Sequence, residues 1–342
     1  MILRELKKKP FLKYAKGYCF SENYAIFCTG KSAFICDKAF NLLHTIEGLS
    51  YVYHAFVSPN EKILLLISNK NIFYLVYLND FSVKKYTIRG EYNTNLEGRG
   101  CWSFDGKSLY FNIFSRKTLN SAMRRYTLSN DMSYEDMLIE KYWLVNIKPI
   151  KELNKYLLIG LDRKKTQVGC WHIIWFDGVL FEECPIYNEN VDNDCISFAE
   201  YEAVTNTIIL YGHDKTYRSD LSGRIIEDMS LSTPQKITGS FSEAISNLGF
   251  KSDVFENLKS LSSSLGIENV SLDDSIYKVC LSFDTKKYYI GTHLGIIVID
   301  AETKKTLGSR NIEYGVQSIT EISPNIIVVS TYCGIKIYEI ID

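Results

Sequence analysis

This 342-residue chain has few of the residues that interrupt regular structure, with only 6 proline and 20 glycine residues. Collagen-like and low-complexity chains need far more of either residue, so both classes are excluded. Neither sign of charge is in excess, because 39 Lys and Arg oppose 40 Asp and Glu and leave a formal net charge of −1. A chain with this balance lacks the broad positive field that attracts nucleic acid or anionic membrane. We therefore expect no membrane partner and do not favour a nucleic-acid partner.

Long apolar runs and an export signal are also missing. No apolar stretch reaches the roughly 18 residues needed to cross a bilayer. The N-terminus reverses the order of a secretory signal, because the apolar residues of Met1–Leu6 precede the cations of residues 7–9. The 9 cysteines are irregularly spaced, and without export we expect buried free thiols rather than a disulfide framework. These observations predict a cytoplasmic location.

Motifs for metal binding and catalysis are scarce. The sequence contains no Cys-x-x-Cys, no Gly-x-Ser-x-Gly and no glycine loop of the kind that cradles phosphate. Cys170 and His172 would share one face of a strand, but two ligands do not make a zinc site, so core packing is favoured. The loop Asp192–Asp194 has oxygen ligands suited to calcium without the spacing of a calcium-binding loop, so a solvated connector is favoured. We assign no catalytic residue, no metal site and no cofactor.

The sequence is instead rich in aromatic residues, with 24 Tyr and 18 Phe, which favour strands. Their arrangement is clearest from residue 276 onward. Residues 276–283 alternate, residues 284–286 form a turn, and two further apolar runs follow at 287–291 and 296–300. With a more polar fourth strand before Arg310, this gives four short strands in about 35 residues, the pattern of one β-propeller blade.

Comparable units occur along the whole chain, and a unit of this kind needs copies of itself to bury its faces. We expect seven blades, over residues 14–47, 52–88, 102–139, 143–186, 196–229, 276–310 and 316–339. The seventh blade would end after three strands, and Ile2–Leu6 would supply the fourth, because an open strand edge invites aggregation. The predicted fold class is therefore all-β: a seven-bladed β-propeller, closed by its N- and C-terminal strands, that forms a single domain over residues 1–342.

Three phrases carry a resemblance to known repeats: Phe-Val-Ser-Pro-Asn-Glu-Lys at 56–62, Trp-Ser-Phe-Asp-Gly-Lys at 102–107 and Ile-Gly-Thr-His-Leu-Gly-Ile-Ile-Val-Ile-Asp at 290–300. They resemble repeats of the WD-repeat and YVTN-type propellers. No Trp-Asp dipeptide ends a third strand and no Gly-His pair opens a blade, and Trp175-Phe176-Asp177 comes nearest. The chain therefore looks like a divergent propeller outside the regular WD-repeat family, whose specific hydrogen-bond networks are not assumed.

A segment of different character, residues 234–274, separates the fifth and sixth predicted blades. Ser240 and Glu243 fit a capping box, and Gly249 and Gly266 fit helix ends, so two helices are predicted. Their apolar faces would contain Phe241, Ile245, Leu248, Phe255, Leu258 and Leu261. Such a surface must be covered, either by its own propeller or by a partner to which it binds as a docking element or lid.

Function is predicted at the level of class. Loops on a rigid scaffold commonly carry binding sites, and one loop face of the propeller would gather side chains of the types found in binding hot spots. The predicted partner-binding residues are Tyr51, Tyr53, Trp143, Arg163, Lys164, His213, Lys215, His293 and Tyr332. We predict a non-catalytic interaction platform, or scaffold, for a protein or peptide. The alternative is a propeller enzyme or small-molecule binder that uses the central channel, and the sequence specifies neither the partner nor the oligomeric state.

Overall fold

The computed structural model describes residues 1–6, 9–88, 92–94, 100–115, 117, 121–129, 132–139, 141–162, 164–165, 169–213, 215–229, 237–240, 269–272, 276–312 and 315–341. The chain divides into two compact units, one of residues 17–228 and one of residues 1–16 and 229–342. Each unit has its own antiparallel sheets and its own apolar core.

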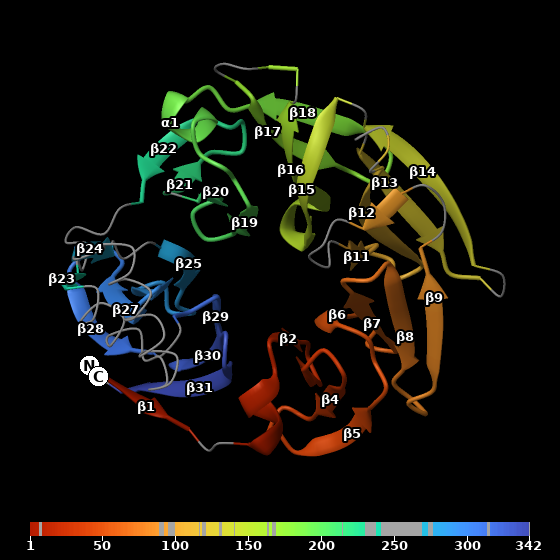
Figure 1. The fold of residues 1–342 in the computed structure, drawn as a ribbon, viewed down its shortest axis with the longest axis horizontal. Helices are drawn as coiled ribbons and strands as arrows, with labels where there is room; N and C mark the ends of the chain where they lie inside the picture. The colour runs from red at the N-terminus through yellow and green to blue at the C-terminus, as the bar shows by residue number, and fades with distance from the viewer. Residues whose placement is uncertain are drawn as a thin grey trace. The chain divides into compact units, whose positions relative to one another are not determined.

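Five sheets make up the unit of residues 17–228 and follow one another in chain order (Figure 1). The first contains β2 (Gly17–Phe20), β3 (Ala25–Cys28), β4 (Ala33–Cys36) and β5 (Leu42–Ile46). The second contains β6 (Val52–Val57), β7 (Ile63–Ser68), β8 (Ile72–Tyr77) and β9 (Val83–Thr87). The third contains β12 (Ser108–Ser115), β13 (Ser121–Thr127) and β14 (Ser133–Ile139), and both β10 (Tyr92–Thr94) and β11 (Gly100–Trp102) pair with β12.

The fourth and fifth sheets complete this unit. The fourth contains β15 (Tyr142–Ile150), β16 (Lys155–Asp162), β17 (Trp171–Phe176) and β18 (Phe181–Pro185), with the short 3₁₀ helix η2 (Lys151–Leu153) in its first turn. The fifth contains β19 (Phe198–Glu202), β20 (Thr207–Tyr211), β21 (Thr216–Ser219) and β22 (Ile225–Asp228). A one-turn helix, α1 (Glu189–Asp192), lies in the connection between them.

The other unit contains the sixth and seventh sheets. The sixth contains β25 (Ile276–Leu281), β26 (Lys287–Thr292), β27 (Gly295–Asp300) and β28 (Thr306–Asn311). The seventh contains β29 (Ser318–Ser323), β30 (Ile326–Thr331), β31 (Gly334–Ile341) and β1 (Ile2–Glu5). β1 pairs antiparallel with β31, with Ile2 opposite Ile341, and the 3₁₀ helix η1 (Pro10–Tyr14) follows it. A separate pair is formed by β23 (Ile237–Ser240) and β24 (Asn269–Leu272).

The seven sheets confirm the seven predicted blades and most of the predicted strands, but three details differ. Pro149 was predicted in a turn but lies in β15. β15 is an edge strand of its sheet, where a missing amide is tolerated. Tyr14 was predicted to open a strand and instead ends η1. Ser240 was predicted to cap a helix and instead ends β23, opposite Asn269. The rest of the predicted helical insertion, with its six apolar-face residues at 241–261, lies outside the described residues.

The turn between first and second strands repeats the same chemistry in three blades. In each, a serine hydroxyl donates to the Asn or Asp side chain two residues later: Ser58 to Asn60 at 2.8 Å, Ser103 to Asp105 at 2.6 Å and Ser282 to Asp284 at 2.6 Å. The same hydroxyl accepts from the backbone amide five residues after it. The residue after the Asn or Asp has a positive φ in all three turns. This local chemistry explains why these turns were visible in the sequence.

Neighbouring sheets within a unit share apolar cores. Among the described residues, clusters of buried side chains join each consecutive pair of the first five sheets. In the other unit one cluster joins the sixth and seventh sheets and includes Leu3 of β1. Polar links add to these cores, since the Glu61 carboxylate accepts from the Glu22 amide at 2.6 Å and Trp102 Nε1 donates to the Phe56 carbonyl at 2.8 Å. Close packing of this kind fixes the strand ends from which the turns project.

Candidate functional site

The strand ends of each blade lie along two opposite edges of its sheet. We call connector edge the end that carries the turn between the second and third strands and the connections to neighbouring sheets, and hairpin edge the opposite end. The structure places the described members of the predicted site at connector edges. They are Tyr51, Tyr53, Trp143, Lys164, His213 and Lys215 in the unit of residues 17–228, and His293 and Tyr332 in the other unit. Arg163 lies outside the described residues.

A buried carboxylate brings His213 and Lys215 together. Asp194, in the connection that precedes β19, accepts from the amide of His213 at 2.7 Å and from the amide of Lys215 at 3.1 Å. The turn packs so tightly on this carboxylate that a Cβ added at Gly212 would lie 2.0 Å from Asp194 Oδ2. Hydrogen bonds from two amides to a carboxylate are stronger than neutral ones, so this turn is held in one conformation.

The same connection holds the corresponding turn of the fourth blade. Asp192, the last residue of α1, accepts from the amides of Gly169 and Cys170 at 2.8 and 2.9 Å. Asp192 and Asp194 are two residues apart, so at most ~7 Å of chain separates the two anchoring points. The acidic loop considered for calcium therefore directs carboxylate oxygens to backbone amides, as a connector that fixes two adjacent turns.

The aromatic members of the predicted site differ in their surroundings. Tyr51 is 52% exposed, and the Nζ of Lys70 lies 4.0 Å from its ring centroid. Trp143 is 37% exposed and stacks on Phe114, with ring centroids 5.9 Å apart. Tyr53 is half-buried, and a Cβ added at Gly30 would meet its ring at 2.9 Å. Tyr51 and Trp143 offer ring surface to a partner, whereas Tyr53 is largely used in packing the first two blades together.

A network in the fourth blade was not found from the sequence. Lys141 Nζ lies 3.0 Å from Glu183 Oε2, and the Tyr142 hydroxyl donates to the same carboxylate. Burial, and then the Glu183 carboxylate, raise the pKa of Tyr142, and burial lowers the pKa of His172, whose ring centroid is 4.8 Å from that of Tyr142. The phenol therefore stays protonated and the imidazole neutral at pH 7. The network fastens β15 to β18 and contains no activated nucleophile.

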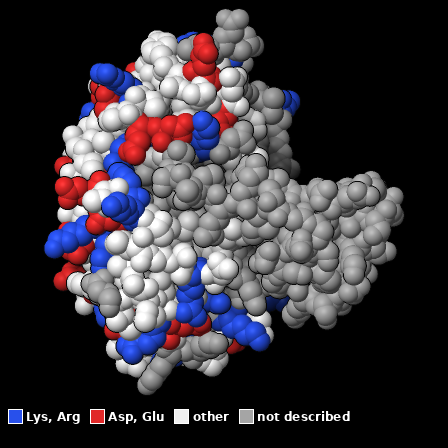
Figure 2. Space-filling model, turned by 90° about the vertical axis from the view of Figure 1, so that its left-hand side faces the viewer, with Lys and Arg blue, Asp and Glu red and all other residues white. Residues whose placement is uncertain are grey.

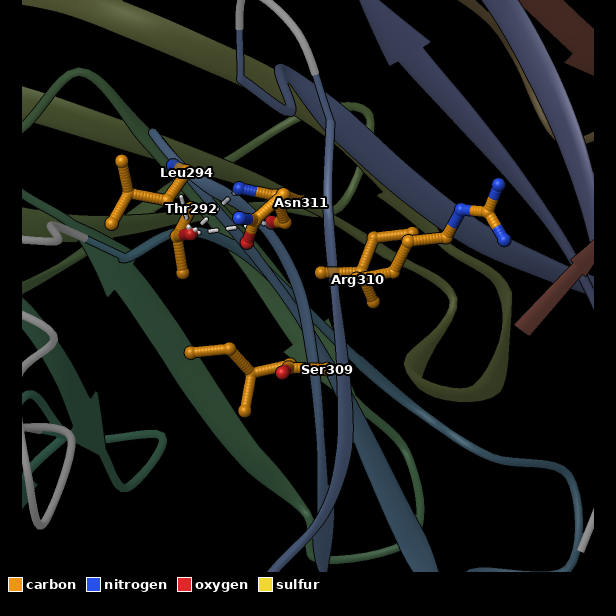
Figure 3. A pocket seen from close by; sticks show the side chains of 8 residues that line it. Thr292, Leu294, Ser309, Arg310 and Asn311 are labelled. Atoms are coloured by element: carbon orange, nitrogen blue, oxygen red, sulfur yellow. Dashed lines mark hydrogen bonds between the residues drawn. The ribbon is translucent and has the colours of Figure 1, made fainter. Parts of the chain in front are cut away.

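The connector edge of the sixth blade has a shallow hollow beside His293. Figure 3 shows Thr292, whose Oγ1 accepts from the amides of Leu294 and Gly295, each at 3.2 Å. The Arg310 side chain extends away from Thr292 in this view and donates to the Leu3 carbonyl. Small-molecule sites are usually cavities of ~300–1,000 Å³, whereas this hollow is open to solvent and encloses almost no space. The hollow is therefore not a small-molecule site.

Sequence reasoning missed two exposed tyrosines at connector edges. Tyr187 is 71% exposed, and its ring lies against Gly169, where an added Cβ would meet it at 3.1 Å. Tyr14 of η1 is 65% exposed. Neither belongs to a repeated position within the blades, so the blade pattern offered no signal for them.

The cysteines agree in part with the expectation of buried thiols. All nine are free. Cys28, Cys36, Cys101 and Cys170 are buried, and burial raises the pKa of the Cys28 and Cys101 thiols. Cys195 and Cys333 are exposed, in contrast to the expectation.

Comparison with known proteins identifies the fold. No family model and no curated protein matches the sequence. The structure is similar to the β-propeller domain of Cps50 (Swd1) from Myceliophteria thermophila, with a TM-score of 0.62 over 99% of this chain and 100% of that domain at 8% identity. The chain has the fold of a seven-bladed β-propeller. The predicted resemblance to WD-repeat-like propellers is thus confirmed for the fold. At 8% identity, the similarity says nothing about function.

Two surface properties complete the description. No helix in the part of the chain that the structure describes is long and apolar enough to cross a membrane. Figure 2 shows cationic and anionic side chains interspersed over the described surface on one side of the molecule. The surface seen there has no extended field of one sign.

Proposed function

We propose that this propeller is a non-catalytic interaction platform, located in the cytoplasm, that binds a protein or peptide through the connector edges of its blades. The observation that carries the proposal is the presence of exposed aromatic and cationic side chains at connector edges, where hydrogen bonds fix several of the turns. Tyr51, Trp143 and Tyr332 are 52, 37 and 64% exposed. Tyrosine and tryptophan dominate binding hot spots, and a turn fixed before binding loses little conformational entropy when a partner binds.

The connection that contains α1 supports this proposal most directly. It fixes the turns next to Lys164, His213 and Lys215 through Asp192 and Asp194. Carboxylates used in this way give the connector edge of two adjacent blades a defined geometry, which specific recognition requires.

Two finer parts of the proposal concern the chain termini and the insertion. We propose that β1, paired with β31, closes the propeller by completing its seventh blade. A variant that lacks residues 1–6 would leave the β31 edge unpaired, and we expect it to self-associate in size-exclusion chromatography with light scattering. A variant that stays monomeric with an unchanged melting temperature would contradict this role. For the insertion, we propose that the apolar side chains predicted at 241–261 contribute to partner binding.

A comparative capture experiment tests the proposed function. Three bait variants are compared with the full-length wild type after their melting temperatures are shown to match. The first carries Trp143→Ala, Lys164→Glu and Lys215→Glu at connector edges, and the second lacks residues 240–266. The control carries Val179→Ser and Leu180→Ser at a hairpin edge, where both residues are exposed.

We expect the first bait to lose the proteins that the wild type retains, and the control to keep them. Equal recovery by all baits, or equal loss by the first bait and the control, would refute binding at the connector edges. If the first bait loses the proteins while the control and the deletion bait both retain them, only the proposed binding role of the insertion is abandoned.

A further inference from the structure

The two edges of the unit of residues 1–16 and 229–342 differ in the charges of their described residues. The described residues at its connector edge are 9–16, 276–278, 291–296, 310–312, 315–319 and 329–336. Their basic side chains are Lys9, Lys13, Lys16, Lys278, His293, Arg310 and Lys336, and these ranges contain no Asp or Glu. The hairpin edge mixes both signs, with Asp284, Asp300, Glu302, Glu321 and Glu339 beside Arg4, Lys286, Lys287, Lys304 and Lys305. Glu5 lies between the two edges, opposite Tyr338 in the β1–β31 ladder.

Exposed aromatic rings lie among the cations of this connector edge. The segment after β1 crosses the β30–β31 turn, because Ser330 Oγ donates to the Lys16 carbonyl at 3.0 Å. It does so closely, since a Cβ added at Gly334 would lie 2.4 Å from the Lys13 carbonyl. The turn itself carries Tyr332, which is 64% exposed.

The crossing segment brings its own ring and two exposed cations. Tyr14 is 65% exposed, and Lys13 Nζ lies 5.4 Å from its ring centroid. Lys13 and Lys16 are both exposed. We call Lys13, Tyr14, Lys16 and Tyr332 the basic aromatic surface.

The cations of this connector edge differ in whether the fold itself uses them. The Arg310 guanidinium donates to the Leu3 carbonyl and lies 5.1 Å from the Tyr338 ring centroid, so it serves the fold. Lys13 and Lys16 have no carboxylate among the described residues of their edge. Opposite charges across an interface steer encounter and favour one class of partner over others.

Resting on the proposed function, we propose that the basic aromatic surface receives a partner segment rich in Asp and Glu. Carboxylates of such a peptide would pair with Lys13 and Lys16, while its apolar groups would contact the rings of Tyr14 and Tyr332. A nucleic acid is the other polyanion with this chemistry. It is not favoured, because the chain has a net charge of −1 and the described surface on the side seen in Figure 2 mixes both signs.

Fluorescence anisotropy with defined probes tests the assignment. The probes are a labelled 16-residue peptide of alternating Glu and Ser, the same peptide with Lys in place of Glu, and a single-stranded oligo-dT. We expect the acidic peptide to bind the full-length protein best and to weaken as NaCl is raised from 50 to 300 mM. Lys13→Glu with Lys16→Glu should weaken it roughly tenfold, which is about 1.4 kcal/mol. Tyr332→Ala should weaken it less, and the matched hairpin-edge variant Lys304→Glu with Lys305→Glu should leave it unchanged.

Three results would overturn the inference: acidic and basic peptides binding equally, the control variant losing as much affinity as the Lys13 and Lys16 variant, or oligo-dT binding more tightly than the acidic peptide. Lys13→Gln with Lys16→Gln repeats the test without charge reversal if the first variant melts at a lower temperature. The outcome is separable from that of the proposed function. Loss of captured proteins by the Trp143, Lys164 and Lys215 bait would still support the platform if the acidic peptide failed to bind.

Discussion

The pair of Arg124 and Asp136 in the third blade allows a stringent test of the packing described above. Arg124 on β13 is 1% exposed, and its Nε and Nη2 donate to Asp136 Oδ1 and Oδ2 at 2.6 and 2.7 Å. Its guanidinium also lies 4.0 Å from the ring centroid of Tyr134. Burial lowers the pKa of Arg124, but its hydrogen bonds and electrostatic interactions with Asp136 and Tyr126 together outweigh burial, and the net direction is upward. The cation is therefore buried and dependent on its carboxylate.

Asp136→Asn should remove that charge with little change of shape. Removing one partner of a buried pair costs ~3–5 kcal/mol, because the other charge is left uncompensated. The Asp136 side chain retains 22% exposure, so we expect the lower end, about 3 kcal/mol of unfolding free energy. A loss of that size lowers the melting temperature by roughly 4–7 °C, the smaller shift applying if the whole chain unfolds together and the larger if the unit of residues 17–228 unfolds alone. Urea titration followed by circular dichroism measures the first quantity, and scanning fluorimetry the second.

The adjacent pair on the same strands is the matched control. Arg125 and Glu135 are 3.4 Å apart, with side chains 39 and 63% exposed, and exposed pairs contribute ~0–1 kcal/mol. Glu135→Gln should therefore change the unfolding free energy by less than about 0.5 kcal/mol. The double variant Arg124→Met with Asp136→Leu should recover most of the stability lost in Asp136→Asn. The reasoning is refuted if Asp136→Asn costs no more than Glu135→Gln.

Three further predictions concern other parts of the fold. Hydrogen bonds from Ser103 and Ser282 hold the pKa of Asp105 and of Asp284 below the usual 3.8. The two carboxylates therefore stabilise the fold fully above about pH 5, and this stabilisation is lost as the pH falls below about 4. In urea titrations, the variant Asp105→Asn with Asp284→Asn should accordingly lose less stability than the wild type between about pH 5 and 3. Asp194→Ala should increase hydrogen exchange at the amides of residues 213 and 215 roughly ten- to a hundredfold and leave residues 169 and 170 protected, whereas Asp192→Ala should do the reverse; equal effects of both variants would contradict the two-anchor description. Gly17→Ala should cost about 1–3 kcal/mol in urea titration, because the new Cβ would lie 1.6 Å from the Tyr53 carbonyl, and an unchanged midpoint would show that β2 and β6 are not as closely packed as described.

The blades were predictable because their signals are local. Ser58, Ser103 and Ser282 each begin a turn whose hydrogen bonds involve residues no more than five positions away. The alternation of apolar and polar residues on either side of such a turn then indicates strands without knowledge of the rest of the chain. The fourth strand of the seventh blade was predicted from the need to cover an open edge, and β1 occupies that position.

The details of the candidate site were less predictable because they depend on contacts between distant residues. The bonds from residues 213 and 215 to Asp194 span 19 and 21 positions, and no local pattern announces them. Asp192 and Asp194 were considered as calcium ligands, with a solvated connector favoured, but composition could not reveal that their oxygens accept from the amides of two other turns. Pro149 was predicted in a turn because proline usually prefers turns. It is tolerated in β15 because β15 is an edge strand, in which some amides have no partner in the sheet.

The pairing of β1 with β31 has a consequence for how the protein is made. Arg4 and Glu339, which form an ion pair across these strands, are separated by 335 positions. At translation rates of ~5–20 residues per second, about 17–67 s pass between the emergence of one partner and that of the other. Throughout that interval the first strand has no sheet to join, and an apolar residue such as Leu3 is available to chaperones or to other nascent chains. The order of synthesis therefore delays completion of the seventh blade until β31 has been made, long after β1.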